Sequence, residues 1–356
     1  MAITYHSGRR IQGVNTDFKG STAGSWKEVG RAKLSSSSSS NIVVNVPNKR
    51  YYMVLQNILG AGGEVGCDMR FNGDSGTNYP MRRNTDRNPQ TGYAAEFTRT
   101  TTYSYLYNGY GGTDTDRFAV VYISNPSDRE KLVISDQCVN VNRSNQTSAP
   151  SHTLMVGKWK GTEDINKIEI VPGTSLAANS EVIVLGYDPK DTHITNFWEE
   201  LSTTSLSANA DNLNSSVFKA KKYIWFQAYM VNSGSIQLEV NMGNDTIDPS
   251  SIYCSRYSYD SGTSTTRESE DSIESESPTS NPAFINGFIV NNATNVKLLT
   301  SHIVHQNTTG AAGTPKSVEM IGKWANTSVQ ANVIGIKNSG GGSFASGSIL
   351  KVWGHD

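Results

Sequence analysis

The chain has 356 residues and a formal net charge of −1 at pH 7. A charge this balanced gives no overall field for nucleic acid or for an anionic membrane, so we expect neither as a partner. The length suffices for two domains that fold without a metal or a disulfide. Cys67, Cys138 and Cys254 show no C-x-x-C spacing and are predicted to be free thiols.

Residues 1–28 have no counterpart later in the chain and are predicted to form an N-terminal arm that docks on a neighbouring domain or subunit. They contain no apolar core typical of a signal peptide, so we expect synthesis in a cytosol. No stretch approaches 18 apolar residues, and membrane insertion is not expected.

Short runs rich in β-branched and aromatic residues follow, separated by clusters of Gly, Asn, Asp, Ser and Pro. This pattern is typical of an all-β sandwich or barrel. The first set of predicted strands covers 42–46, 51–59, 118–124, 131–135, 165–171 and 181–185. The second set covers 222–231, 235–240, 284–290, 296–299, 329–336 and 348–353. Between the sets, residues 195–201 are predicted to be helical, in a linker whose Phe197 and Trp198 pack at the domain junction.

One five-residue phrase occurs twice, as M-V-G-K-W ending at Trp159 and as M-I-G-K-W ending at Trp324. The two copies lie about one domain length apart, and other matching stretches precede and follow them in the same order. The sequence therefore predicts an internal duplication, with β-sandwich repeat 1 over residues 29–189, a linker over 190–203 and repeat 2 over 204–356.

The tryptophans of this phrase are predicted to be the core signature of each sandwich, because a buried indole provides a large apolar contact. Strand alternation would then point Lys158 and Lys323 outward. Carbohydrate stacking on exposed Trp159 and Trp324 is the alternative interpretation.

Two loops at the same place in the repeats differ in chemistry and are the candidate recognition or assembly loops. The first is rich in tyrosine, which gives a large contact area at low entropic cost: Tyr103, Tyr105, Tyr107 and Tyr110. The second is acidic and rich in serine: Glu268, Glu270, Asp271 and Glu274. Subunit or domain packing remains the alternative for the first, and a solvated surface loop or an ion or partner contact for the second.

The chain contains no G-x-S-x-G, H-E-x-x-H or P-loop motif, so we predict no catalytic residue, cofactor or metal. Glycosidase carboxylates need a rigid floor that fixes their separation, which a serine-rich loop does not provide. The residues favour a non-enzymatic protein.

Several phrases resemble virion structural proteins, the tandem β-sandwich proteins of marine tailed phages and related viruses of microbes. They are I-T-Y-H-S-G-R-R-I-Q-G near the start, G-Y-D-P-K-D-T-H-I-T-N-F-W-E-E-L from Gly186, G-K-W-A-N-T-S at Trp324 and F-A-S-G-S-I-L-K-V-W-G-H-D at the end. The resemblance covers most of the chain. It implies a pair of jelly-roll-like domains on a capsid or tail, in a symmetric homo-oligomer with other virion proteins as partners and a host glycan or receptor as a further partner.

The expectation is therefore a virion surface protein, either a capsid decoration or a tail fibre or spike. A double jelly-roll capsid protein is one alternative, because two stacked sandwiches per chain make that architecture. A carbohydrate-binding module or depolymerase is the other, and it would depend on the tryptophans, the tyrosine loop or Glu270 and Glu274.

Overall fold

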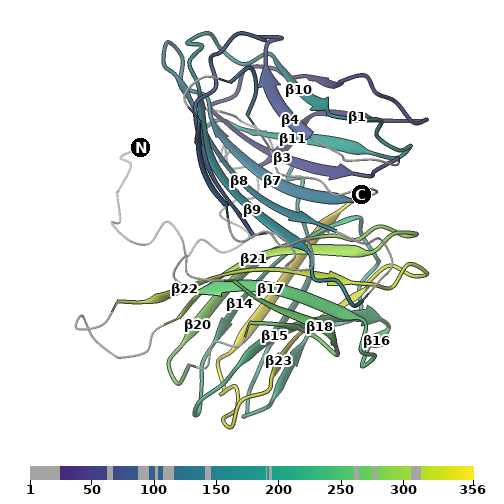
Figure 1. Ribbon diagram of the computed structural model, residues 1–356. Helices are drawn as coiled ribbons and strands as arrows, with labels where there is room; N and C mark the ends of the chain where they lie inside the picture. The colour runs from purple at the N-terminus through teal and green to yellow at the C-terminus, as the bar shows by residue number, and fades with distance from the viewer. Residues whose placement is uncertain are drawn as a thin grey trace.

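A computed structural model describes residues 25–61, 67–86, 96–100, 103–106, 116–140, 146–189, 191, 195–259, 264–275, 279–305 and 314–356. Within these ranges the chain is all-β without a helix, which confirms the predicted class. We call residues 25–189 the first half and residues 195–356 the second half. The two halves lie one above the other in Figure 1. Residues 1–24 of the predicted arm lie outside the described residues.

The first half pairs an eight-stranded sheet with a three-stranded sheet. The large sheet has the order β1-β11-β3-β7-β8-β9-β5-β6, the small one β2-β10-β4, and paired strands are antiparallel. The strands are β1 (Lys27–Lys33), β2 (Ile42–Asn45), β3 (Tyr51–Ile58), β4 (Cys67–Phe71), β5 (Met81–Asp86), β6 (Glu96–Thr100), β7 (Arg117–Ser124), β8 (Lys131–Val139), β9 (Ser151–Trp159), β10 (Lys167–Pro172) and β11 (Glu181–Tyr187).

The second half pairs an eight-stranded with a five-stranded sheet. The large sheet has the order β12-β24-β14-β20-β21-β22-β17-β18, and the small one has β13-β23-β15-β16 with β19 also paired to β15. The strands are β12 (Glu199–Ser205), β13 (Asn212–Asn214), β14 (Tyr223–Met230), β15 (Leu238–Asn244), β16 (Thr246–Ile247), β17 (Tyr253–Tyr259), β18 (Thr265–Glu270), β19 (Ile273–Glu274), β20 (Ala283–Val290), β21 (Lys297–His305), β22 (Lys316–Trp324), β23 (Val333–Asn338) and β24 (Ile349–His355).

The two large sheets follow the same path through the sequence, and polar contacts recur at matching places. Asn125, one residue after β7, donates from Nδ2 to the carbonyl of Lys49 at 2.9 Å. Asn291, one residue after β20, donates from Nδ2 to the carbonyl of Lys221 at 2.8 Å. These contacts fix how the residues of one large sheet correspond to those of the other.

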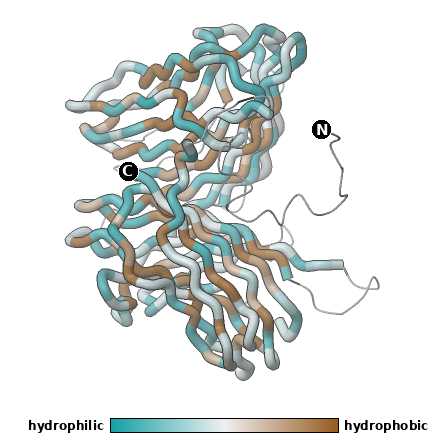
Figure 2. Tube along the Cα trace, turned by 180° about the vertical axis from the view of Figure 1, so that it is seen from behind, coloured by the Kyte–Doolittle hydropathy of each residue, from teal (hydrophilic) through white to brown (hydrophobic). Residues whose placement is uncertain are grey.

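Each half has its own apolar core between its large and its small sheet. Val54, Val121 and Trp159 belong to the first core, and Phe226 and Trp324 belong to the second. Strand alternation explains this, because every second side chain of a strand points to the same face. Figure 2 shows the hydrophobic positions along the strands of both halves.

A third apolar cluster joins the halves where the outer faces of the two large sheets meet. We call this contact the junction. Its first-half members are Met53, Leu55, Phe118, Val120, Cys138, Ile183 and Leu185. Its second-half members include Phe197, Trp198, Tyr223, Phe288, Val290, Leu298 and Ile321. Here β21 packs against β7 and β8.

The predicted helix over residues 195–201 is wrong. Strand β12 begins at Glu199 and pairs with β24, as β1 pairs with β11 in the first half. A helix this short is marginal by itself, and pairing with an existing sheet outweighs its propensity. The aromatic pair of this segment does pack at the junction, since Phe197 and Trp198 are 4% and 3% exposed.

The cysteine prediction is confirmed for Cys138 and Cys254, which are buried free thiols. The side chain of Cys67 lies outside the described residues.

Candidate functional site

The repeated tryptophans occupy equivalent core positions. Trp159 is 0% exposed and donates from Nε1 to Asp74 Oδ2 at 2.7 Å. Trp324 is 1% exposed and donates from Nε1 to Asp248 Oδ2 at 3.0 Å. The core-signature prediction is confirmed. Carbohydrate stacking on these indoles is wrong, because their faces are covered by protein.

The lysines of the repeated phrase differ from one another. Lys158 is exposed and pairs with Glu130, as alternation predicts. Lys323 is fully buried, and its Nζ donates to Asn140 Oδ1 of the first half at 3.0 Å. The prediction fails for Lys323 because the outer face of the second large sheet is covered by the first half at this point.

The glycines of the repeated phrase leave room for side chains of the two candidate loops, the tyrosine loop and the acidic segment. A Cβ added at Gly157 would lie 2.5 Å from Leu106 Cδ2, and one at Gly322 would lie 2.5 Å from Ile273 Cγ2. Leu106 pairs with Met69 of β4, and Ile273 lies in β19 beside β15. Each loop therefore places one apolar side chain over the glycine of its own half.

Gly322→Ala is expected to destabilise the protein by ~1 to 3 kcal/mol, the usual cost of overpacking a filled core. Gly157→Ala should cost less, because the methyl group it meets ends the flexible side chain of Leu106, whereas three atoms of Ile273 crowd Gly322. Urea denaturation followed by circular dichroism measures both. The second substitution Ile273→Ala should recover part of the loss, and no recovery would contradict this packing account.

The described part of the tyrosine loop is anchored to the first sandwich. Tyr103 is 36% exposed, and its ring meets that of Tyr105 edge-on at a centroid distance of 4.9 Å. Leu106, which follows, is fully buried. Tyr107 and Tyr110 lie outside the described residues, so the structure does not test a recognition surface made by all four tyrosines.

The acidic segment is not a solvated loop, so that alternative interpretation is wrong. Residues 265–270 form β18, paired with β17, and Glu268 is half-buried. Its Oε1 accepts a hydrogen bond from the backbone NH of Ala149 at 2.9 Å, and the backbone NH of Ser269 donates to the carbonyl of Gln146 at 3.0 Å. The segment contacts the first half because it belongs to an edge hairpin beside the junction.

Basic side chains pair with two of the remaining acidic candidates, Asp271 and Glu274. Lys337 Nζ lies 2.8 Å from Asp271 Oδ1 and 3.2 Å from Glu239 Oε2. Arg267 Nε lies 3.4 Å from Glu274 Oε2. Burial, with the nearby charges of Glu239 and Glu270, raises the pKa of Glu274 to about 7. These side chains hold β18 and β19 against the second sandwich, while Glu270 itself is half-buried in β18.

A second polar cluster crosses the junction around Asp136. His152 Nε2 lies 2.8 Å from Asp136 Oδ1, and His302 Nε2, from the second half, lies 3.1 Å from Oδ2. Burial opposes ionisation of Asp136, but hydrogen bonds from both imidazoles outweigh it and hold its pKa well below the usual range. Burial likewise opposes protonation of His302, but Asp136 outweighs it and raises the pKa of His302.

The His302 contact should make stability depend on pH. A raised histidine pKa contributes stability that is complete below the unfolded value, about 6.5, and is lost as pH rises through the folded value. The lowered pKa of Asp136 contributes stability above its unfolded value, about 3.9, and this is lost as pH falls through the folded value. Urea titrations between pH 5 and pH 9 should show the wild type losing more stability above about pH 6.5 than His302→Gln, and equal slopes would contradict the assignment.

The outer face of the first large sheet remains exposed beyond the junction. Five large apolar side chains there are between 36% and 59% exposed: Tyr51, Tyr122, Leu132, Ile134 and Val156. They come from β3, β7, β8 and β9, which are neighbours in the sheet. We call these five residues the open face. A contiguous exposed apolar surface of this kind makes the open face a candidate contact site.

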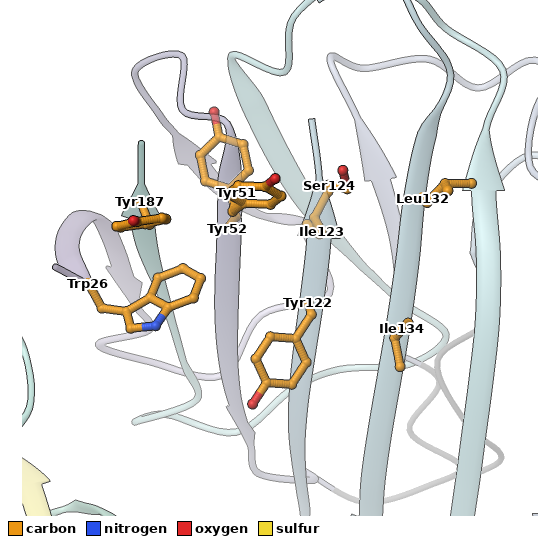
Figure 3. A pocket seen from close by; sticks show the side chains of 9 residues that line it. All are labelled: Trp26, Tyr51, Tyr52, Tyr122, Ile123, Ser124, Leu132, Ile134 and Tyr187. Carbon is orange, nitrogen blue, oxygen red and sulfur yellow. The ribbon is translucent and has the colours of Figure 1, made fainter. Parts of the chain in front are cut away.

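A groove of about 490 Å³ crosses the open face. Figure 3 shows Trp26 and Tyr187 on one side, Leu132 and Ile134 on the other, and the rings of Tyr51, Tyr52 and Tyr122 between them. Ser124 supplies the groove with its one aliphatic hydroxyl. Such a lining fits apolar or aromatic side chains better than a polar ligand, which needs several hydrogen-bonding partners.

The sequence interpretation missed the open face, although a signal was present. In β8 the consecutive residues Leu132, Val133 and Ile134 are all apolar, whereas a strand with one solvated face alternates. Val133 points into the core, and its two neighbours point outward. Consecutive apolar residues in a strand therefore signal apolar side chains on both of its faces.

No protein-family model matches the chain, and no curated protein matches it. Among solved structures, Ail, the attachment invasion locus protein of Yersinia pestis, aligns at 10% identity over 76% of this chain and 97% of that chain, with a TM-score of 0.12. The outer membrane protein OprG from Pseudomonas aeruginosa aligns at 8% identity over 86% of this chain and 98% of that chain, with a TM-score of 0.11. Neither likeness supports a shared fold.

Among the described residues, no helix has the length and apolar character needed to cross a membrane. In the same ranges, no group of three or more His, Cys, Asp and Glu side chains is placed to hold a metal ion.

Proposed function

We propose that this chain is a non-enzymatic structural protein of a virion surface, a capsid decoration or a tail fibre or spike, that assembles as a symmetric oligomer. The observation that carries the proposal is the open face, where Leu132, Ile134 and Val156 are 59%, 58% and 50% exposed on one rigid sheet. A monomer working alone gains nothing from such a surface, whereas an assembling subunit buries it. The sequence phrases that resemble virion proteins supply the kind of assembly.

The finer fold belongs to the same proposal: two tandem jelly-roll-like sandwiches, derived by duplication, with residues 1–28 as an arm. The equal strand orders, the Asn125 and Asn291 contacts and the matched Trp159 and Trp324 contacts support the duplication. In this scheme repeat 1 covers residues 29–189 and repeat 2 covers 204–356. Strands β1 and β12 each begin a few residues before these boundaries.

The proposal is tested on particles purified from an infected host culture. Peptides of this chain should be found by mass spectrometry in washed particles, and gold-labelled antibodies against it should decorate the particle surface. Labelling of every vertex or face would favour a decoration or a double jelly-roll capsid protein. Labelling at one end would favour a fibre or spike. Absence of the chain from particles that contain all other structural proteins would refute the proposal.

Glycan binding is a second candidate, and the aromatic groove is the observation that favours it, because Tyr51 and Tyr122, 38% and 36% exposed, line it together with Trp26. A glycan array with the wild type and Tyr122→Ala tests it. Binding that Tyr122→Ala abolishes would support a carbohydrate-binding module at this groove.

A further inference from the structure

The large sheets can be compared residue by residue, because Asn125 and Asn291 follow β7 and β20 and make the same contacts. Tyr122 of β7 then corresponds to Phe288 of β20. The same register holds for the neighbouring strands, since Lys131 pairs with Trp159 as Lys297 pairs with Trp324.

Every member of the open face has a buried counterpart in the second half. The counterparts of Tyr51, Tyr122, Leu132, Ile134 and Val156 are, in that order, Tyr223, Phe288, Leu298, Thr300 and Ile321. All five are at most 5% exposed, and four of them, all but Thr300, belong to the apolar cluster of the junction. The same region of the sheet is thus covered in one half and open in the other.

The opposite relation holds at the other end of the outer face. In the second half, Tyr229, Phe284 and Val304 are 46%, 37% and 43% exposed. We call these three residues the far row, because they pair across neighbouring strands β14, β20 and β21. Their first-half counterparts, listed in the same order, are Asn57, Phe118 and Cys138, which are at most 1% exposed.

The junction is therefore a head-to-tail contact between two equivalent sheets. The far end of the first sheet, around Phe118 and Cys138, covers the region of the second sheet that contains Phe288 and Leu298. A head-to-tail contact leaves one surface of each kind unused. In this chain the unused pair is the open face and the far row.

We propose that the far row of a second copy of this chain docks on the open face, repeating the junction between molecules. The inference rests on the proposed assembly function and names its partner. Because the contact is head-to-tail, each added copy presents a new open face or far row. The assembly closes into a ring if the rotation per copy allows it, and otherwise grows as a filament.

The junction also predicts which side chains meet. Phe118 lies with its ring centroid 6.4 Å from that of Tyr223. Their counterparts are Phe284 in the far row and Tyr51 in the open face. Repeating the contact between copies brings Phe284 onto Tyr51, which lines the groove of about 490 Å³. A benzyl side chain matches the aromatic lining there.

The contact between copies should be weaker than the junction. Leu55 and Val120 of the first half are apolar and buried at the junction, but their counterparts in the second half are Gln227 and Asn286. These two amides are hydrogen-bonded to each other, with Gln227 Nε2 3.1 Å from Asn286 Oδ1. Less apolar area is buried at such an interface, so assembly should depend on protein concentration.

Light scattering coupled to size-exclusion chromatography of the full chain tests the proposal. The wild type should associate in a concentration-dependent way. Ile134→Lys on the open face and Val304→Lys on the far row should each weaken association by about 30-fold or more, the factor for losing a central contact. Val43→Lys is the matched control, because Val43 is an exposed apolar residue of β2 in the small sheet; it should associate like the wild type. Circular dichroism and thermal melts confirm that each variant is folded.

Mixing the two disrupted variants gives the sharpest outcome. Ile134→Lys keeps an intact far row, and Val304→Lys keeps an intact open face, so an equimolar mixture should form a one-to-one dimer that grows no further. A two-fold contact of open face on open face predicts instead that Val304→Lys associates like the wild type, and this result would overturn the proposal.

A wild type that stays monomeric at millimolar concentration would also overturn it. So would a variant lacking residues 1–24 that associates while the full chain does not, because the open face would then be covered by the chain's own N-terminal segment. Each of these results leaves the virion proposal standing if the chain is found on purified particles. Absence from particles, with head-to-tail association intact, would refute the virion role alone.

Discussion

Trp159→Ala and Trp324→Ala should each lower the free energy of unfolding by ~3 to 5 kcal/mol, the range for truncating a large buried aromatic side chain. Trp159 packs against Phe71 with a centroid distance of 5.6 Å and stacks on Tyr79 with an interplanar angle of 13°. Alanine would leave a cavity among these rings that the rigid sheets cannot close.

The second tryptophan has the same surroundings, which predicts a similar cost. Trp324 stacks on Tyr253 with an interplanar angle of 14°, and Lys297 Nζ lies 5.4 Å from its ring centroid. Burial lowers the pKa of Lys297 to about 8. Loss of the indole would remove the stacking partner of Tyr253 and the cation–π contact of Lys297.

Phenylalanine separates the two contributions of the indole. Trp159→Phe retains most of the apolar contact but leaves Asp74 Oδ2 without its 2.7 Å hydrogen bond, so a loss of ~1 to 3 kcal/mol is expected. Urea denaturation followed by circular dichroism measures each value. Val217→Ala, at an exposed side chain, is the control and should change stability by less than ~0.5 kcal/mol. A cost below ~1 kcal/mol for either alanine variant would show that the core assignment is wrong.

Much of the fold could be predicted because local pattern and tertiary environment agree. The runs at 51–59 and 118–124 are apolar, β-branched and bounded by turn residues, and they form β3 and β7. The repeated M-[VI]-G-K-W phrase located the core tryptophans because an indole buried in one copy is buried in the other. Regular strands and shared core positions are therefore readable from a single sequence.

The parts that failed depend on contacts between distant segments. Strand alternation predicts that Lys323 faces solvent, but in the folded chain it is buried and donates to Asn140 of the first half. Glu268 lies in a serine-rich stretch whose composition predicts a loop. Its carboxylate nevertheless accepts a hydrogen bond from the backbone NH of Ala149. Which half carries the open face could not be predicted from the sequence either. The counterparts of the open face in the second half are covered by contacts within the chain, and no local sequence pattern indicates which half is left exposed.

The difference between the halves also places function away from the repeated phrase. Trp159 and Trp324 hold each sandwich together and have no free surface. Equivalent positions of the two large sheets that differ in exposure, such as Ile134 and Thr300, are where one half has an internal partner and the other has none within the described residues. Assembly properties should therefore change on substitution at the open face and the far row, whereas substitutions at the tryptophans should change stability alone.

Glu181→Gln should cost ~3 to 5 kcal/mol, because it removes one charge of a buried ionic cluster that ties the halves together. Glu181 is 2% exposed in β11. Its Oε1 lies 3.2 Å from Arg31 Nη1. Its Oε2 accepts a hydrogen bond from the hydroxyl of Tyr223 at 2.9 Å and forms an ion pair with Lys222 Nζ. Glutamine keeps the size of the side chain but leaves the Lys222 charge without its carboxylate, while Arg31 keeps its pair with Glu28.

The carboxylate of Glu181 also makes the stability of this ionic cluster depend on pH in the acid range. Burial would raise the pKa of Glu181, but the hydrogen bond and charge of Lys222 outweigh it and hold the pKa below the usual value. A lowered carboxylate pKa contributes stability above the unfolded value, about 4.3, and this is lost as pH falls through the folded value. The wild type should therefore lose more stability than Glu181→Gln between about pH 5 and pH 3.

Glu130→Gln is the matched control, because the Glu130–Lys158 pair is 42% and 41% exposed and should contribute less than ~1 kcal/mol. Equal costs for the two glutamine variants would show that Glu181 acts as an ordinary surface charge. Since Lys222 and Tyr223 belong to the second half and Glu181 to the first, loss of this cluster should also lower the cooperativity between the halves. Urea curves that separate into two transitions for Glu181→Gln, but remain single for Glu130→Gln, would identify the cluster as a principal link across the junction.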